Sequence, residues 1–411
     1  MSIQHPLATL EESFGAHNYK PLPVVLAHGN GACIWDTAGR RYLDFVSAYS
    51  AVSFGHSHPR LVSALTRQAG RLALTSRAFY TDQLGPFLKK LCELVQMDRA
   101  LPMNSGAEAV ETALKAARKW AYQMKGVPAD RAEIIVCDGN FAGRTISIVS
   151  FSSEAQYIEG FGPRTPGFRS IPFGDAAALE RAITPATAAF LVEPIQSEAG
   201  VRVPPDGYLA AVREICSRHN VLLILDEIQT GLGRTGHLLA CDHESVRPDG
   251  LTLGKALGGG LLPISAFLAR RDVMDVFTPG DHGSTLGGNP LACAVASEAL
   301  DVLQTEGLAE RARARGEQFL EGLRAINSSV IREVRGRGLL IGLELACGAA
   351  EGRQWAERIV AAGVLTKDTH GNVLRFAPPL VISPAEVDEA LSVLNSVFSE
   401  RRPAHSMQST M

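Results

Sequence analysis

The stretch from residue 221 to residue 260 restricts the possible folds of this chain more than any other part of it. Five apolar residues, 221–225, stop at two carboxylates, Asp226 and Glu227. A short apolar run closed by polar residues is typical of a strand that is buried on both faces, as in a parallel sheet. In open sheets of this kind, ligands bind beyond the carboxyl ends of the strands. We therefore expect Asp226 to lie at a ligand site.

A second apolar run, 251–253, leads to Gly254 and Lys255, and more glycine follows at 258–260. Small neighbours leave the lysine amine open to a bulky planar molecule. A purely structural interpretation of Asp226 and Lys255 is an ion pair or two unrelated surface charges. The alternative is a site for pyridoxal phosphate (PLP), with Lys255 as the Schiff-base lysine and Asp226 on the pyridinium nitrogen. These two residues alone leave the choice open.

Residues 231–236 also match G-x-G-x-x-G, the dinucleotide-binding fingerprint. That fingerprint has to open a helix directly after its strand. Residues 237–250 are short and mixed, contain Pro248 and show no helical apolar stripe. We therefore do not expect a nicotinamide or flavin at this loop.

Composition limits the class of protein. The 411 residues allow one large and one small domain, and 46% hydrophobic with 20% charged residues is ordinary globular usage. A net charge of −3 indicates neither a nucleic-acid nor a membrane partner. No apolar run reaches the ~18 residues of a membrane span, and the first residues resemble no targeting signal. The seven cysteines are scattered without C-x-x-C, which predicts reduced thiols in the cytoplasm.

The first part of the chain predicts little regular structure. Residues 1–20 are polar and are expected to form a loose, irregular arm. Residues 29–45 alternate apolar and polar side chains around an Asp/Gly turn, which predicts a β-hairpin. His56 and His58 raise a metal site as an alternative, but no third ligand is usefully spaced, so we expect no metal.

The clearest helix begins after Ser105. Ser105 and Glu108 form a capping box, and an apolar face follows over residues 110–117. The backbone amides of Gly106 and Ala107 have room to approach a phosphate at the positive end of this helix. An ordinary helix cap is the alternative, and it would be preferred if this segment stood alone.

Strands and helices alternate through the middle of the chain. Strands are expected at 133–137, 189–192 and 264–268, in addition to the one before Asp226, and a helix around 209–216 leads to that strand. This alternation predicts an α/β fold with a doubly wound sheet. A change of pattern near residue 298 suggests three parts: an N-terminal arm and hairpin segment (1–49), a large cofactor-binding domain (50–297) and a small C-terminal domain (298–411). Ser383 to Glu386 should cap a last helix.

Residues 226–236, followed by Gly254, Lys255 and Ala256, resemble the signature of class III PLP-dependent aminotransferases. The resemblance extends from Trp35 to the last helix. It includes short similar segments at residues 75–80, 141–145, 193–196, 282–285 and 374–380. It implies the fold type I architecture, a large domain with a mostly parallel central sheet flanked by helices and a smaller α+β domain. It also implies a homodimer whose active sites lie at the subunit interface.

The resemblance implies a set of cofactor-binding residues: Ser105, Gly106, Ala107, Phe141, Asp226, Ile228, Gln229, Lys255, Ser284 and Thr285. In that set, Asp226 and Lys255 are the catalytic pair, and Gln229 contacts the ring oxygen. Ile228 and Phe141 cover the two faces of the ring.

The phosphate group completes this expectation. The amides of Gly106 and Ala107 would bind it in one subunit, and Ser284 and Thr285 would reach it from the neighbouring subunit. Without the resemblance, residues 284–285 would be read as a surface turn.

Within the family, these segments are most similar to those of members that transfer the δ-amino group of ornithine to 2-oxoglutarate. The substrate residues implied are Tyr49, Tyr80, Arg144, Glu198 and Arg375. While it is paired with Glu198, Arg375 would not bind the carboxylate of ornithine. After the pair separates, Arg375 would bind a carboxylate of 2-oxoglutarate. Ser197 departs from the glycine of the ornithine enzymes, so its hydroxymethyl group would be able to shift Glu198.

Other functions remain open at this stage. Acetylornithine or 4-aminobutyrate aminotransferase is the alternative within the same chemistry. A PLP aminomutase or decarboxylase would not consume 2-oxoglutarate in step with the amine donor. A non-catalytic PLP-binding or scaffold protein is disfavoured, because binding alone requires no carboxylate–arginine switch.

Overall fold

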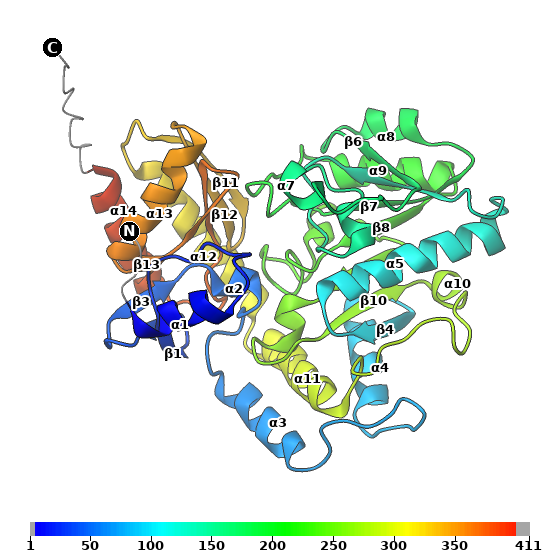
Figure 1. Ribbon diagram of the computed structural model, residues 1–411, viewed down its shortest axis with the longest axis horizontal. Coiled ribbons are helices and arrows are strands. Elements are labelled where there is room, and N and C mark those ends of the chain that lie inside the picture. The colour runs from blue at the N-terminus through cyan, green and yellow to red at the C-terminus, as the bar shows by residue number, and fades with distance from the viewer. Residues whose placement is uncertain (1–4, 400–411) are drawn as a thin grey trace.

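The computed structural model describes residues 5–399, which form three β-sheets with helices around them (Figure 1). The seven-stranded sheet and its helices make up one half of the view. The two four-stranded sheets lie in the other half, where the first and last parts of the chain meet. Within residues 5–399, no helix is both long and apolar enough to cross a membrane.

The central sheet has the strand order β4-β10-β9-β8-β7-β5-β6. All its neighbouring strands are parallel except β10, which is antiparallel to both β4 and β9. Its strands are β4 (Arg99–Met103), β5 (Glu133–Cys137), β6 (Phe168–Ile171), β7 (Thr187–Val192), β8 (Leu222–Asp226), β9 (Gly250–Leu253) and β10 (Ser265–Ala269). The strands predicted from the apolar runs are therefore confirmed, with ends that shift by one or two residues.

Strand β8 is covered on both faces, as its continuous apolar run predicts. Leu222 and Ile224 belong to the hydrophobic cluster that includes helix α5 (Gly106–Trp120). Leu223 and Leu225 belong to the other large cluster, which includes α9 (Tyr208–Arg218). Further helices around this sheet are α6 (Ile146–Val149), α7 (Ala155–Ile158), α8 (Ala176–Ala182), α10 (Arg271–Met274), and the short helical turns η1 (Ala121–Lys125), η2 (Ala240–Glu244) and η3 (Lys255–Gly258). The doubly wound α/β fold is confirmed.

The two smaller sheets combine the ends of the chain. The first has the order β1-β2-β3-β13, so a late strand pairs in parallel with the N-terminal hairpin. The second, which we call the C-terminal sheet, has the order β11-β12-β15-β14. The strands are β1 (Leu26–Asn30), β2 (Cys33–Asp36), β3 (Arg41–Asp44), β11 (Ile331–Arg337), β12 (Leu340–Leu345), β13 (Val364–Leu365), β14 (Lys367–Thr369) and β15 (Val373–Phe376). Helices α12 (Leu308–Ala325), α13 (Ala349–Ala361) and α14 (Pro384–Ser399) pack on these strands and on each other.

The predicted change of pattern near residue 298 falls inside helix α11 (Pro290–Thr305). This helix packs against α3 (Pro59–Ala69) and α4 (Leu84–Val95) and also contacts α12. It is therefore a connection between the two halves of the molecule. The division into 1–49, 50–297 and 298–411 stays a prediction.

The prediction of an irregular arm over residues 1–20 is wrong for part of it. Helix α1 spans Pro6–Phe14, with Pro6 in its first turn and the His5 ring accepting a hydrogen bond from the amide of Leu7. Leu7, Leu10 and Phe14 stand at the i, i+3, i+7 spacing of one helix face, a signal that the sequence prediction overlooked, although no residue of α1 is buried. Residues 1–4 lie outside the described part of the chain.

Phe319 of α12 connects three parts of the fold, because its ring lies 5.0 Å from that of Phe45 and 5.5 Å from that of Phe376. We expect Phe319→Ala to lower the free energy of unfolding by about 3–5 kcal/mol, the usual cost of emptying an aromatic core position. Phe14→Ala, on the exposed helix α1, is the control and should change it by less than about 0.5 kcal/mol. Urea unfolding followed by circular dichroism checks both, and equal midpoints would contradict this view of the core.

Candidate active site

A cavity of about 190 Å³ opens at the carboxyl edge of the central sheet, where β7 and β8 end. Its walls come from the start of α5, the loop after β5 and the segments that follow β7, β8 and β9. The lining residues are Gly106, Ala107, Phe141, Ala142, Gly143, Glu193, Glu198, Asp226, Ile228, Gln229 and Lys255. The structure thus brings most of the residues predicted for the cofactor into one place.

Asp226 is the last residue of β8 and is buried. Its Oδ1 accepts hydrogen bonds from the amide of Ile228 at 3.1 Å and from Thr252 Oγ1 at 3.0 Å, the latter on the adjacent strand β9. Burial raises the pKa of Asp226 to about 6, although these hydrogen bonds lower it. The carboxylate is therefore charged at neutral pH, with Oδ2 left to meet a cationic partner.

Lys255 follows β9 and Gly254 and lies deep in the same cavity. Its backbone adopts a φ of +43°, a left-handed conformation that is costly for a residue with a side chain. Burial lowers the pKa of Lys255 to about 8, against the raising effect of Glu198, Asp226 and other nearby carboxylates. A substantial fraction of the amine is consequently unprotonated, as a nucleophile requires.

The start of α5 has the features of an anion site. The predicted capping box is confirmed, since Ser105 Oγ accepts from the amide of Glu108 and the Glu108 carboxylate accepts from that of Ser105. A Cβ at Gly106 would lie 3.0 Å from Cδ1 of Ile228, so a side chain there would crowd the cavity. Ser284 Oγ accepts a 2.7 Å hydrogen bond from Asn104 Nδ2 of the same chain.

Thr285 is exposed in the next position of that loop. The structure therefore places Ser284 and Thr285 near the start of α5 of their own chain. Their predicted contact with the phosphate of a neighbouring subunit stays a prediction.

The residues present fit PLP. Both side-chain atoms of Gln229, Nε2 and Oε1, are buried, and neither finds a hydrogen-bond partner among the described residues. Such a group is costly unless a ligand satisfies it, and the ring hydroxyl of PLP would be a hydrogen-bond partner for this amide. The carboxylate, the amine, the amide and the helix N-terminus together match the ring nitrogen, aldehyde, hydroxyl and phosphate of PLP.

The predicted substrate pair is formed at the edge of this cavity. Glu198 and Arg375 make an ion pair, and Arg375, on β15, is only 4% exposed. Burial opposes the charge of Glu198, but Arg375 and Lys255 outweigh it and hold its pKa below the usual value. The guanidinium carbon of Arg375 lies 5.0 Å from the centre of the Tyr49 ring, so three of the predicted substrate residues lie together.

The other two predicted substrate residues differ in their placement. The guanidinium of Arg144 lies over the ring of Tyr157 at 3.7 Å and 5.5 Å from that of Phe141, so it borders the cavity. Tyr80 is fully exposed and does not line the cavity of its own chain. The contribution of Tyr80 to substrate binding stays a prediction.

Ser197 does not disturb its neighbour. It is buried, its φ is not left-handed, and Glu198 still pairs with Arg375. Its Oγ has no hydrogen-bond partner among the described residues.

Sequence reasoning missed Glu193, which ends the apolar run of β7 as Asp226 ends that of β8. Its carboxylate accepts the amide of Phe141 at 3.0 Å, and burial followed by the nearby Asp226 raises its pKa to about 8. The same strand-end pattern would have indicated it. Tyr157 and Tyr19 were also missed, and Tyr19 is one of the groups near Tyr49 that add to the effect of burial on the pKa of Tyr49. Tyr19 lies in an irregular stretch and Tyr157 in the four-residue helix α7, and no sequence pattern indicates either of them.

The remaining sequence features have structural contacts. His56 hydrogen-bonds to Asp44 at 2.8 Å, and His58 lies 3.2 Å from Glu306. Residues 231–236 form turns that lead to the short η2, without the long helix of a dinucleotide fold.

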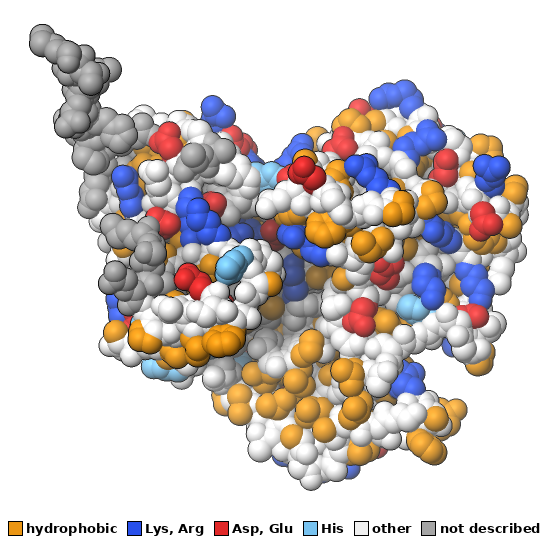
Figure 2. Space-filling model, in the orientation of Figure 1, with side chains coloured by type: hydrophobic (Ala, Val, Ile, Leu, Met, Phe, Trp, Pro, Cys, Tyr) orange, Lys and Arg blue, Asp and Glu red, His pale blue; other side chains and the backbone are white. Residues whose placement is uncertain are grey.

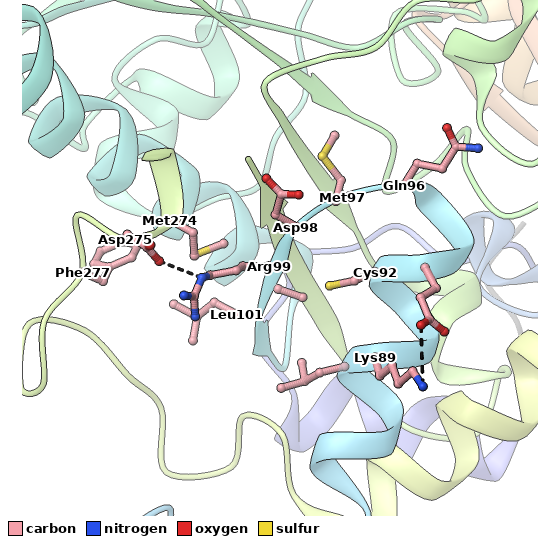
Figure 3. A pocket seen from close by; sticks show the side chains of 13 residues that line it. Lys89, Cys92, Gln96, Met97, Asp98, Arg99, Leu101, Met274, Asp275 and Phe277 are labelled. Carbon is pink, nitrogen blue, oxygen red and sulfur yellow. Dashed lines mark ion pairs between the residues drawn. The ribbon is translucent and has the colours of Figure 1, made fainter. Parts of the chain in front are cut away.

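A larger groove of about 790 Å³ lies at the opposite edge of the sheet (Figure 3). It runs between the end of α4, the start of β4 and α10, and its Arg99 pairs with Asp275 at 2.7 Å. None of the predicted site residues lines it. Volume alone therefore does not locate the chemistry.

Comparison with known proteins gives the same assignment. The family model described as "Aminotransferase class-III" matches residues 14–398. The chain belongs to the class III aminotransferases. The fold predicted from the resemblance is confirmed, and this class III aminotransferase is a PLP-dependent enzyme, since PLP is the cofactor of the family.

Several relatives are similar over nearly the full length. This class III aminotransferase is 56% identical over 397 residues to the ornithine aminotransferase of Bordetella pertussis, covering 97% of this chain and 96% of that one. It is 55% identical to that of Geobacillus sp., covering 97% and 100%. The crystal structure of ornithine aminotransferase from Toxoplasma gondii ME49 has a TM-score of 0.94 at 50% identity, covering 95% and 94%. Acetylornithine aminotransferase from Elizabethkingia anophelis has a TM-score of 0.88 at 49% identity, covering 95% and 98%.

The lowered pKa of Lys255 predicts how the cofactor-free enzyme takes up PLP. Covalent attachment needs the neutral amine, whose fraction rises with pH and levels off above the pKa of about 8. An ordinary lysine would continue to gain reactivity up to about pH 10.4. Stopped-flow absorbance after mixing with PLP checks this, with Nα-acetyllysine as the control amine. A rate that follows the control to pH 10 would contradict the buried environment of the amine.

Proposed function

We propose that this enzyme transfers the δ-amino group of L-ornithine to 2-oxoglutarate. The products are glutamate and glutamate 5-semialdehyde, which cyclises to pyrroline-5-carboxylate. The observation that carries the proposal is the ion pair between Glu198 and the buried Arg375, beside Lys255. The similarity to curated ornithine aminotransferases across 97% of the chain supports it.

PLP, when bound, supplies an electrophilic aldehyde and a ring that accepts electron density. Asp226 Oδ2 is available to keep the ring nitrogen protonated by direct charge pairing in a site that excludes water. Lys255 Nζ takes a proton from the reacting carbon of the substrate and returns it to the cofactor side. A positioned base of this kind is typically worth about 10²–10⁴ in rate.

Ornithine has to present its far amine to Lys255. Arg144 and Tyr49 lie near residues of the cavity, and we expect them to hold the α-carboxylate and the α-amino group, respectively. Arg375 is neutralised by Glu198, so it does not compete for that carboxylate. The δ-amine is then the group that reaches the bottom of the cavity.

The second substrate needs the opposite arrangement. 2-Oxoglutarate must place its α-keto carbon at the bottom of the cavity, with one carboxylate on each side. If Glu198 turns away, the buried guanidinium of Arg375 is free to bind the α-carboxylate through two parallel hydrogen bonds. Arg144 takes the distal carboxylate. One cavity thereby accepts two differently charged substrates in turn.

Product analysis tests this function directly. Wild-type enzyme with ornithine and 2-oxoglutarate should form pyrroline-5-carboxylate, detected with o-aminobenzaldehyde. Glu198→Gln removes the charge that neutralises Arg375, so it should add the α-transamination product and raise the rate with glutamate as donor. Absence of pyrroline-5-carboxylate from the wild type would overturn the function, and an unchanged product ratio in Glu198→Gln would overturn the switch.

Acetylornithine is a second candidate donor, because an acetylornithine aminotransferase is 49% identical to this chain. An acetylated α-amino group would lose a donor that the Tyr49 side of the cavity can accept. Initial rates with ornithine and with N-acetylornithine, each at saturating 2-oxoglutarate, separate the two. A higher kcat/KM for N-acetylornithine would reassign the donor.

We also propose a homodimer with shared active sites. Hydrophobic side chains gather over the lower part of the face seen in Figure 2, where Figure 1 places α3, α4 and α11. Exposed residues near these elements and in the adjoining loops are Val62, Leu72, Leu74, Phe79, Tyr80 and Leu286. A contiguous exposed apolar surface of this kind marks a protein interface. We further propose a cytoplasmic location, because the cysteines are scattered along the sequence without a C-x-x-C motif.

Phe79, which is 70% exposed, offers a test of the dimer. We expect Phe79→Asp to convert a dimer into a monomer and to lower activity, because it places a charge in an apolar interface. Met124→Asp is the matched control: Met124 is also exposed, lies on η1 at the far end of α5, and its substitution should leave the dimer intact. Light scattering coupled to size-exclusion chromatography measures both, and a monomeric wild type would refute the proposal.

A further inference from the structure

Glu198 lies in a tight turn that spans residues 197–201. The base of the turn is closed by Gln196 and Arg202, whose amides donate to each other's carbonyl groups at 3.1 and 2.9 Å. Inside the turn, Val201 is fully buried and adopts a φ of +52°. A β-branched residue avoids this conformation, so the surrounding structure must hold it there.

Arg335 of β11 binds this turn through hydrogen bonds to its backbone. Its Nη2 and Nε donate to the carbonyl oxygen of Gly200 at 2.8 and 3.1 Å, and Nε also donates to that of Val201 at 3.2 Å. Its Nη1 donates to the carboxylates of Glu333 and Glu344, both at 2.7 Å. The guanidinium is therefore fixed between two acidic side chains on one side and the turn on the other.

A second contact joins the same two parts of the molecule. Thr369 Oγ1 of β14 donates to the carbonyl oxygen of Glu198 at 2.5 Å. Arg335, Thr369 and Arg375 stand on β11, β14 and β15 of the C-terminal sheet. The sheet that carries Arg375 also holds the turn that carries Glu198, so both partners of the ion pair are positioned by one rigid element.

We propose that Arg335 is a positioning residue that determines regiospecificity, because it holds the turn so that Glu198 neutralises Arg375 when the amine donor binds. This inference rests on the proposed function, whose two half-reactions need that pair closed and then open. Without Arg335, the strained turn relaxes, Glu198 moves off Arg375, and the free guanidinium captures the α-carboxylate of ornithine. The α-amine then reaches Lys255.

Lysine cannot replace this arginine fully. A single ammonium group donates from one point, whereas Arg335 reaches two carbonyl oxygens and two carboxylates with a planar fork. Arg332 provides the matched control, because it lies on the same strand and pairs with Glu344 at 3.2 Å, whereas its hydrogen bonds and ion pairs within residues 5–399 do not reach the turn.

The experiment compares Arg335→Gln, Arg335→Lys and Arg332→Gln as PLP-loaded enzymes with ornithine and 2-oxoglutarate. Liquid chromatography with mass spectrometry separates the two cyclic products, pyrroline-5-carboxylate from δ-transfer and pyrroline-2-carboxylate from α-transfer. We expect the α-to-δ ratio to rise about tenfold in Arg335→Gln and less in Arg335→Lys, with wild-type behaviour in Arg332→Gln. Added to Glu198→Gln, Arg335→Gln should change the ratio little further, since both act through one carboxylate.

Amide hydrogen exchange gives a readout that does not depend on turnover. Exchange at residues 197–202 should be faster in Arg335→Gln than in Arg332→Gln, with equal rates in the central sheet. Thr369→Val, which removes one hydrogen bond to the turn, should show a smaller effect of the same sign. This variant replaces Arg335→Gln in both measurements if Arg335→Gln does not fold. An α-to-δ ratio or a local exchange rate equal to that of Arg332→Gln would overturn the proposal. Absence of pyrroline-5-carboxylate from the wild type would instead overturn the proposed function.

Discussion

Two buried groups of opposite charge, the carboxylate of Asp226 and the amine of Lys255, govern this site. Burial moves their pKa values toward each other, to about 6 and about 8. At neutral pH the carboxylate is charged and part of the amine is not. A ligand with a basic ring nitrogen and an aldehyde is a better partner for both groups than water, because its nitrogen can pair with the carboxylate and its aldehyde can react with the amine. Strands β8 and β9 are parallel, so both residues lie at the same edge of the sheet. The sheet topology therefore brings the two reacting groups together.

The C-terminal sheet supplies what the central sheet cannot. It carries Arg375 on β15, and it holds the turn of Glu198 through Arg335 and Thr369. The cofactor half of the cavity is thus built on one sheet and the substrate half on contacts between two. This arrangement separates the reaction, which depends on Asp226 and Lys255, from the choice of the amine that reacts.

Local rules were sufficient for much of the fold and for the centre of the site. The apolar run before Asp226 and the capping box at Ser105 predicted β8 and the start of α5, because both depend on neighbouring residues. Local rules were less useful for the solvent-exposed helix α1, which buries no residue. Tyr80, which was assigned from the family resemblance, is fully exposed and does not line the cavity of its own chain. The contact of Arg335 with the turn has no local signature, since Gly200 and Val201 lie more than a hundred residues away in the sequence.

The central claim is that Lys255 alone, among the lysines of this protein, forms the covalent bond to PLP. Reduction of the loaded enzyme with borohydride, followed by proteolysis and mass spectrometry, fixes and locates that bond. We expect one modified peptide, with the cofactor mass on Lys255, and loss of that modification in Asp226→Ala at limiting PLP. Cofactor mass spread over surface lysines, or absent from the peptide that contains Lys255, would contradict it.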